Sequence, residues 1–255
     1  MAKLKMVLID LSGTLHIDNS VITGAVEALN RLRSTNINIK FVTNTTKESK
    51  NLLYNRLINL GFKIDKEEIF SSLEAARRVI ISKQLKPLLF LDEQAVEDFE
   101  DLITDEKPNA ILVGLAPDKF KYEILNEAFR LLLDGATLIA IHEGKYYKRP
   151  DGLALGPGAF IKALEYSAKV RAEVVGKPTA NFFKAALGDI KPEEAIMIGD
   201  DVNDDVAGAQ AIGIKGILVQ TGKYRENDEN TIDPPPTKVC PSIVEAIDAI
   251  INSAI

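Results

Sequence analysis

The sequence predicts an α/β fold built on a doubly wound parallel sheet. Three observations support this fold class. Short apolar segments of four to six residues alternate with amphipathic helical patterns along the chain. These segments are continuously apolar, as expected for strands that are covered on both faces of a parallel sheet. Polar motifs follow several of the segments directly, at the position where open α/β sheets bind ligands.

Composition narrows the class of protein. The 255 residues are 46% hydrophobic and 27% charged, which is typical of a globular protein with a buried core. The 31 basic and 37 acidic residues give a net charge of −6 without a basic stripe, so we expect no nucleic-acid partner. The one cysteine, Cys240, cannot form an internal disulfide and fits a cytoplasmic location. No window approaches 18 apolar residues, so we expect no membrane partner.

Eight apolar segments are predicted to be strands. Amphipathic patterns over residues 24–34, 47–60 and 118–133 predict helices between them, and a last helix is expected over about 242–251. Thr45 and Glu48 fit a capping box at the start of the second helix. The alternation implies right-handed βαβ units. The predicted strands are 6–9, 37–42, 87–91, 110–113, 137–141, 172–175, 195–198 and 216–219.

Two polar motifs follow the first two predicted strands. Asp10 begins the motif DLSGTL after segment 6–9, which places a carboxylate at the carboxyl edge of a buried strand. An Asp that caps its own turn is the competing structural explanation. Thr43 and Asn44 follow segment 37–42. There a hydroxyl, an amide and nearby helix N–H groups can form a phosphate-binding site.

A lysine motif and an acidic cluster follow two later strands. Lys177 lies in the motif GKP after segment 172–175; alone, a lysine at such an edge is more often a solvated surface residue. Four carboxylates lie within six residues after segment 195–198, and they repel one another unless a cation or hydrogen bonds compensate. Because the ligands are hard oxygens, the cluster indicates Mg²⁺ rather than zinc. An acidic turn that caps the next helix explains only Asp204 or Asp205.

With DLSGTL, VTNTT, GKP and GDDVNDD in this order, the sequence resembles the haloacid dehalogenase superfamily, and specifically its capped, C2-type phosphatases. The resemblance implies a Rossmann-like catalytic core of residues 1–82 and 172–255 with an inserted, smaller α/β cap domain, residues 83–171. It implies an Mg²⁺-dependent phosphatase that hydrolyses a phosphoric monoester, a phosphoramidate or pyrophosphate in a small phosphorylated substrate. The family also contains homodimers formed through the cap, although no feature of this sequence requires one.

The resemblance assigns a role to residues of each motif. Asp10 would attack phosphorus and form an aspartyl-phosphate. Substrate binding would fall to Ser12, Thr43 and Asn44, and Lys177 would neutralise charge on the phosphoryl group and orient Asp10.

The same resemblance implies the metal ligands. Asp10, the main-chain carbonyl of Ser12 and Asp200 would hold Mg²⁺. Asp205, or alternatively Asp204, would orient the ligands without binding the ion.

Ser12 is a departure from the family pattern. Most phosphatases of the family have a second Asp at this position, which protonates the leaving group and later activates water. A serine hydroxyl is a poor acid or base near pH 7, so we expect a preference for leaving groups that need little protonation, as in aryl phosphates, pyrophosphate and phosphoramidates. The alternative is a non-catalytic or weakly active descendant that binds Mg²⁺ or phosphate.

Two other functions fit the sequence less well. A receiver-type phosphoacceptor domain also combines Asp, Thr, Lys and an acidic pair, but it is about half this length and carries the acidic pair on its first strand. Dehalogenation gives no reason for the carboxylate cluster. The sequence therefore favours a phosphatase.

Overall fold

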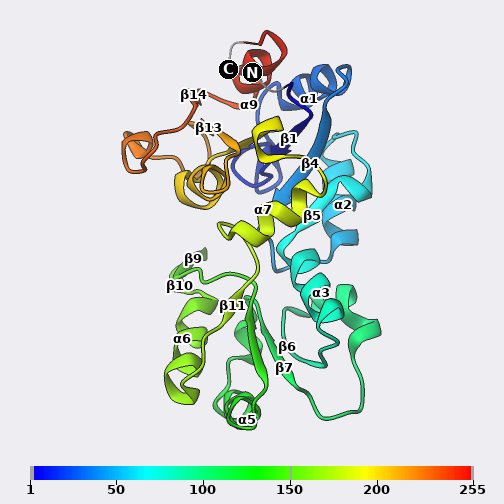
Figure 1. Ribbon diagram of the computed structural model, residues 1–255, viewed down its shortest axis with the longest axis vertical. Coiled ribbons are helices and arrows are strands. Elements are labelled where there is room, and N and C mark those ends of the chain that lie inside the picture. Colours follow the sequence, from blue (N-terminus) through cyan, green and yellow to red (C-terminus); the bar gives the residue numbers. More distant parts are fainter. Residues whose placement is uncertain (1–2, 150, 254–255) are drawn as a thin grey trace. The chain divides into compact units, whose positions relative to one another are not determined.

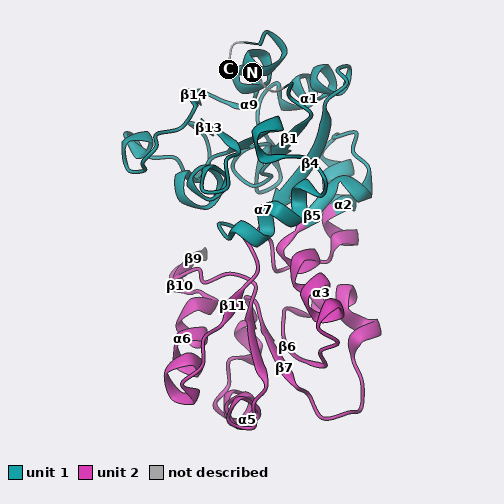
Figure 2. Ribbon diagram, in the orientation of Figure 1, with its two compact units in different colours: residues 1–43, 54–70, 177–255 teal, residues 44–53, 71–176 magenta. Residues whose placement is uncertain are grey.

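The computed structural model describes residues 3–149 and 151–253. The chain forms two compact units, drawn in teal and magenta in Figure 2. Unit 1 contains residues 1–43, 54–70 and 177–255, and unit 2 contains residues 44–53 and 71–176. In the described ranges, no helix has both the length and the apolar character needed to cross a membrane.

Unit 1 is built around a six-stranded sheet with the order β14-β13-β12-β1-β4-β5 (Figure 1). Every residue of β1 is buried, as is every residue of β12, which confirms that these apolar segments are covered on both faces. Strand β1 pairs in parallel with β4 and β12, and β13 pairs in parallel with β12 and β14. The strands are β1 (Met6–Ile9), β4 (Asn38–Thr43), β5 (Ile69–Ser71), β12 (Ala195–Gly199), β13 (Lys215–Val219) and β14 (Lys238–Cys240).

Helices and one small hairpin complete this part of the chain. Helix α9 begins after Ser242, which forms a capping box with Glu245, and it is joined to α1 by an Arg31–Asp248 ion pair. The helices are α1 (Ala25–Arg33), α2 (Lys50–Asn59), α7 (Ala180–Leu187), α8 (Gly208–Gln210) and α9 (Ile243–Ile251), with a π-helical turn at Val202–Ala207 and 3₁₀ turns at Lys66–Glu68, Pro192–Glu194 and Asp228–Asn230; the hairpin is β2 (His16–Ile17) and β3 (Ser20–Val21). The first four residues of α2, 50–53, are assigned to unit 2 and the rest of the helix to unit 1.

Unit 2 contains a four-stranded parallel sheet, β11-β8-β7-β6, and a separate two-stranded hairpin. Side chains from β7, β8, α5 and α6 form its buried core, and Phe120 stacks on Phe160 at 3.9 Å between ring centroids. The strands are β6 (Pro87–Phe90), β7 (Ala110–Val113), β8 (Thr137–Ala140), β9 (Tyr146–Arg149), β10 (Gly152–Leu155) and β11 (Glu173–Val174); the helices are α3 (Ser72–Ser82), α4 (Glu93–Val96), α5 (Tyr122–Leu133) and α6 (Pro157–Ala168), with 3₁₀ segments Glu97–Leu102 and Pro117–Lys119.

The segment before Lys177 belongs to a different sheet from the one expected. We expected residues 172–175 to form a strand of the core sheet, but β11 pairs with β8 in unit 2, with Glu173 opposite Ile139. The units divide the chain at 70/71 and 176/177, and also at 43/44 and 53/54, whereas the expected core-to-cap boundaries were 82/83 and 171/172. An apolar segment identifies a strand, but it does not identify the neighbours with which the strand pairs.

The predicted start of the second helix is also wrong. Helix α2 begins at Lys50, three residues later than the expected start at 47. The Ser49 hydroxyl accepts the main-chain N–H of Leu52 and donates to Glu97 at 2.5 Å, so Ser49 takes the place expected for Thr45. Ser and Thr are both good capping residues, and here the contact with Glu97 adds a reason for the later start that no local pattern contains.

Candidate active site

Asp10 lies directly after β1, at the carboxyl edge of the unit 1 sheet. Its main-chain N–H donates to the carbonyl of Ile198 at 2.9 Å and thereby continues the pairing of β1 with β12. Its side chain is buried, and the Asp10 residue is only 6% exposed. The main chain of Asp10 is thus fixed by a hydrogen bond to β12, at the end of the two central strands of the sheet.

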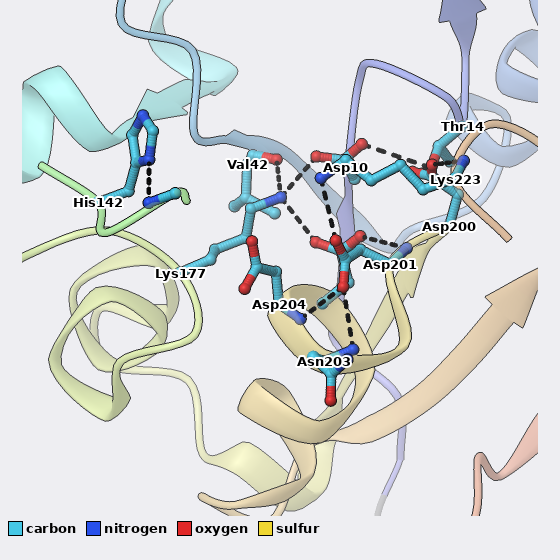
Figure 3. Close-up of polar contacts among 12 residues, drawn as sticks. Asp10, Thr14, Val42, His142, Lys177, Asp200, Asp201, Asn203, Asp204 and Lys223 are labelled. Carbon is cyan, nitrogen blue, oxygen red and sulfur yellow. Dashed lines mark hydrogen bonds and ion pairs between the residues drawn. The ribbon is translucent and has the colours of Figure 1, made fainter. Parts of the chain in front are cut away.

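Lys177 is buried and contacts Asp10 and the carbonyl of Val42 (Figure 3), and it also contacts Asp205. Its ammonium donates to Asp10 Oδ1 at 2.5 Å, to Asp205 Oδ1 at 2.7 Å and to the carbonyl of Val42 at 3.2 Å. Three acceptors match the three protons of an ammonium group. Although no core strand precedes Lys177, its side chain reaches the edge where β1 and β4 end.

Asp200 lies beside this pair and is held by two donors. Its Oδ1 accepts the Thr14 hydroxyl at 3.1 Å, and its Oδ2 accepts the main-chain N–H of Lys223 at 2.7 Å. The Thr14 oxygen also lies 3.5 Å from Asp10 Oδ2, so Thr14 lies next to both carboxylates. Gly13 has φ +97°, and a Cβ there would be 2.1 Å from Asp200 Oδ2, so this position requires glycine.

The rest of the acidic cluster shapes its own turn. Asp201 Oδ1 accepts the main-chain N–H groups of Asn203 and Asp204, and Asp205 Oδ2 accepts the N–H of Asp201. The capping role that we considered for Asp204 or Asp205 therefore belongs to Asp201. Asp205 instead bonds to Lys177, so its carboxylate contributes to the buried site.

The carboxylate oxygens of the site are suitable ligands for a hard divalent cation. Asp10, Asp200 and Asp205 are all buried, and each offers one carboxylate oxygen within 4.8 Å of the others. If all three are ionised, Lys177 offsets one of the three charges, and a divalent cation would neutralise the other two. Mg²⁺ prefers such oxygen ligands, whereas zinc in proteins is most often bound by sulfur or nitrogen.

Burial makes the carboxylates reluctant to ionise. It raises the pKa of Asp10 to about 6, against the opposing effect of Lys177, and the neighbouring Asp200 charge adds to the rise. Burial likewise raises the pKa of Asp205 to about 6 and raises the pKa of Asp200. Burial and the repulsion between neighbouring carboxylates both disfavour the ionised forms. A bound cation would favour the ionised forms and lower these pKa values.

The remaining predicted residues lie as follows. Thr43 is buried at the end of β4, next to Val42, and Ser12 is exposed two residues after Asp10. Asn44 belongs to unit 2, where it is half-buried. The structure therefore brings Asp10, Lys177, Asp200 and Asp205 together.

Sequence reasoning missed three residues of this site: Thr14, Thr221 and Lys223. Thr14 lies inside the first motif, two residues after Ser12. Thr221 and Lys223 follow β13, the last of the eight predicted strands, just as the other motifs follow theirs. The same rule about strand ends could have identified them.

Replacing Lys177 tests the buried ion pair. We expect Lys177→Met to lower the free energy of unfolding of the metal-free protein at pH 7 by about 3–5 kcal/mol, because it leaves two buried carboxylates without their cation. Lys5→Met is the control: Lys5 pairs with Glu194, but its side chain is 53% exposed, so about 1 kcal/mol or less should be lost. Denaturant unfolding measures both, and equal losses would contradict the assigned importance of Lys177.

Family models and known proteins that match this chain point to the same family as the four sequence motifs. A haloacid dehalogenase-like hydrolase model matches residues 7–102, and a HAD-hydrolase-like model matches residues 174–246. The chain is 57% identical to haloacid dehalogenase-like hydrolase domain-containing protein 2 of Homo sapiens, covering 98% of this chain and 96% of the relative. It is 38% identical to phospholysine phosphohistidine inorganic pyrophosphate phosphatase of Xenopus laevis, covering 98% and 95%.

Solved structures show the same architecture. The 4-nitrophenylphosphatase of Thermotoga maritima matches with a TM-score of 0.86 and 25% identity, covering 97% of each chain. The p-nitrophenyl phosphatase of Archaeoglobus fulgidus matches with a TM-score of 0.87 and 27% identity, covering 97% of this chain and all of that one. The α/β fold with its Rossmann-like core is thus confirmed. With the ordered motifs and the matching relatives, these findings show that the chain belongs to the haloacid dehalogenase-like hydrolase family.

Proposed function

We propose that this protein is an Mg²⁺-dependent phosphatase that transfers a phosphoryl group first to Asp10 and then to water. The observation that carries the proposal is the buried contact of 2.5 Å between the Lys177 ammonium and Asp10 Oδ1, beside Asp200. Membership of a hydrolase family supports it. So do the names of the relatives, which are phosphatases of phospholysine, phosphohistidine, pyrophosphate and nitrophenyl phosphate.

Asp10 would act as the nucleophile. A carboxylate oxygen of Asp10 forms a bond to phosphorus while the bond from phosphorus to the leaving-group oxygen or nitrogen breaks, and the leaving group then takes up a proton. Water next attacks phosphorus, which releases phosphate and restores the carboxylate. Lys177 holds one oxygen of Asp10 and so orients the nucleophile.

Other residues would bind the substrate. Thr43 and Asn44 follow β4 and would donate to phosphate oxygens, with Ser12 nearby on the chain. The Lys177 ammonium would offset negative charge that develops on the phosphoryl group. Asp205 would keep this ammonium in place, since it accepts a hydrogen bond from it at 2.7 Å.

Mg²⁺ would be held by Asp10, the main-chain carbonyl of Ser12 and Asp200. When bound, the ion supplies positive charge that stabilises the phosphoryl oxygens during transfer. Asp205 is already bonded to Lys177 and to the N–H of Asp201, which suits a supporting role.

Ser12 limits the substrates that react well. Its side chain is exposed, and a hydroxyl cannot give or take a proton efficiently near pH 7. We therefore propose small substrates with good leaving groups: aryl phosphates, pyrophosphate or phosphoramidates.

Asp10→Asn tests the proposed nucleophile. The substitution keeps the size of the side chain but removes the attacking carboxylate, so turnover of p-nitrophenyl phosphate with Mg²⁺ should fall by at least about 10³-fold. Asp248→Asn, an exposed substitution on α9, should leave turnover unchanged. Full activity in Asp10→Asn would refute the proposal, and Mg²⁺ binding without turnover in the wild-type protein would favour the non-catalytic alternative.

Ser12→Asp tests the proposed cause of the leaving-group preference. A new carboxyl group should raise kcat for an alkyl phosphate by about 10²-fold or more, with a smaller gain for an aryl phosphate, because only the poor leaving group needs the proton. Ser12→Asn is the control, since it has a similar shape and no acid. The ratio of the two rates is measured in all three proteins, and an unchanged ratio in Ser12→Asp would reject this explanation.

Mg²⁺ affinity should depend on pH with a definite sign. Because the pKa of Asp10 and that of Asp205 are raised to about 6, protons compete with the cation below pH 6. The dissociation constant should then rise by about tenfold per pH unit for each proton displaced. Calorimetric titration in two buffers should detect proton release on Mg²⁺ binding at pH 5.5 and little release at pH 7.5. Equal affinity and no proton release at the two pH values would contradict the predicted competition between protons and Mg²⁺.

A further inference from the structure

Residues 221–223, which we call the clasp, join the two segments that carry Asp10 and Asp200. The clasp follows β13 and contacts both segments directly. The Thr221 hydroxyl donates to the main-chain carbonyl of Gly13 at 2.5 Å, and the main-chain N–H of Lys223 donates to Asp200 Oδ2 at 2.7 Å. One short loop therefore holds the chain after β1 and the chain after β12.

Gly222 closes the remaining space between these two contacts. It has φ +58°, and a Cβ on it would lie 2.2 Å from Asp200 Oδ2 and 2.5 Å from the Cα of Gly13. A Cβ on Gly13 would meet the same Asp200 carboxylate. The two glycines thus pack directly on Asp200, which leaves its carboxylate little room to turn.

Lys223 also reaches the turn that carries the acidic cluster. Its ammonium lies 3.0 Å from Asp201 Oδ2, while Asp201 caps the turn through its other oxygen. The Lys223 side chain is 67% exposed, so this ion pair alone contributes little to stability. Its effect is geometric, because the same residue contacts Asp200 through its main chain and Asp201 through its side chain.

We propose that the clasp is a positioning element for the cation site, with Thr221 as its main polar contact. By holding the Gly13 carbonyl, Thr221 fixes the chain between Ser12 and Thr14, and Thr14 in turn donates to Asp200. The carboxylates of Asp10 and Asp200 are then held together before the cation binds. Outer hydrogen bonds of this kind typically change metal affinity by about 10–100-fold. The inference rests on the proposed Mg²⁺ site.

The test compares Mg²⁺ dissociation constants measured by calorimetric titration. Thr221→Val removes the hydroxyl with little change of shape and should weaken Mg²⁺ binding by about 10–100-fold. Thr221→Ser restores the hydroxyl and should bind like the wild type. Thr231→Val is the matched control, because it removes a similar bond, from the Thr231 hydroxyl to the carbonyl of Asp228, in a turn outside the site.

The outcomes separate the inference from the proposed function. Unchanged Mg²⁺ affinity in Thr221→Val would overturn the proposed role of the clasp. An equal loss of Mg²⁺ affinity in Thr231→Val would also overturn it, because the effect would then reflect general loop stability. If Thr221→Val does not fold, Thr221→Ala gives the same comparison without the added methyl group. Absence of Mg²⁺ binding in the wild-type protein would overturn the proposed function itself, and the clasp with it.

Discussion

One buried ammonium, shared by two buried carboxylates, is the interaction on which the site depends. Burial alone would lower the pKa of Lys177, but Asp10 and Asp205 more than reverse this and raise it above its ordinary value, so Lys177 stays charged. The carboxylates have raised pKa values in the same place because Lys177 does not fully offset their burial. When its carboxylates are ionised, the site therefore carries excess negative charge, which a divalent cation would offset.

The unit 1 sheet explains how residues far apart in sequence reach this place. Parallel strands end at a common edge, and β1, β4, β12 and β13 deliver Asp10, Thr43, Asp200 and the clasp there. Glycines at 13 and 222 allow the loops to approach Asp200 closely. A rigid sheet with short loops thus places the charged groups, and the loops need no strained non-glycine residue at these contacts.

Most of the strands and most of the charged residues of the site could be predicted from local sequence patterns. An apolar segment predicts a strand, and a polar motif directly after it predicts a residue at the carboxyl edge of the sheet. Asp10, Asp200 and Asp205 were found in this way, and so was Lys177, although its strand belongs to the other sheet. The pairing of β11 with β8 and the later start of α2 could not be predicted, since each depends on contacts made by residues distant in sequence. The rule about strand ends could have identified the positions of Thr221 and Lys223, but only the folded chain shows the hydrogen bonds that they make.

The most direct test of the central claim is to look for the phosphoryl group on Asp10. The protein is mixed with Mg²⁺ and p-nitrophenyl phosphate, quenched in acid within one turnover, digested and analysed by mass spectrometry. Since Ser12 cannot activate water efficiently, the intermediate should accumulate, with phosphate on the peptide that contains Asp10 and none in Asp10→Asn. Turnover with phosphate on a different residue, or with the same signal in Asp10→Asn, would contradict the account.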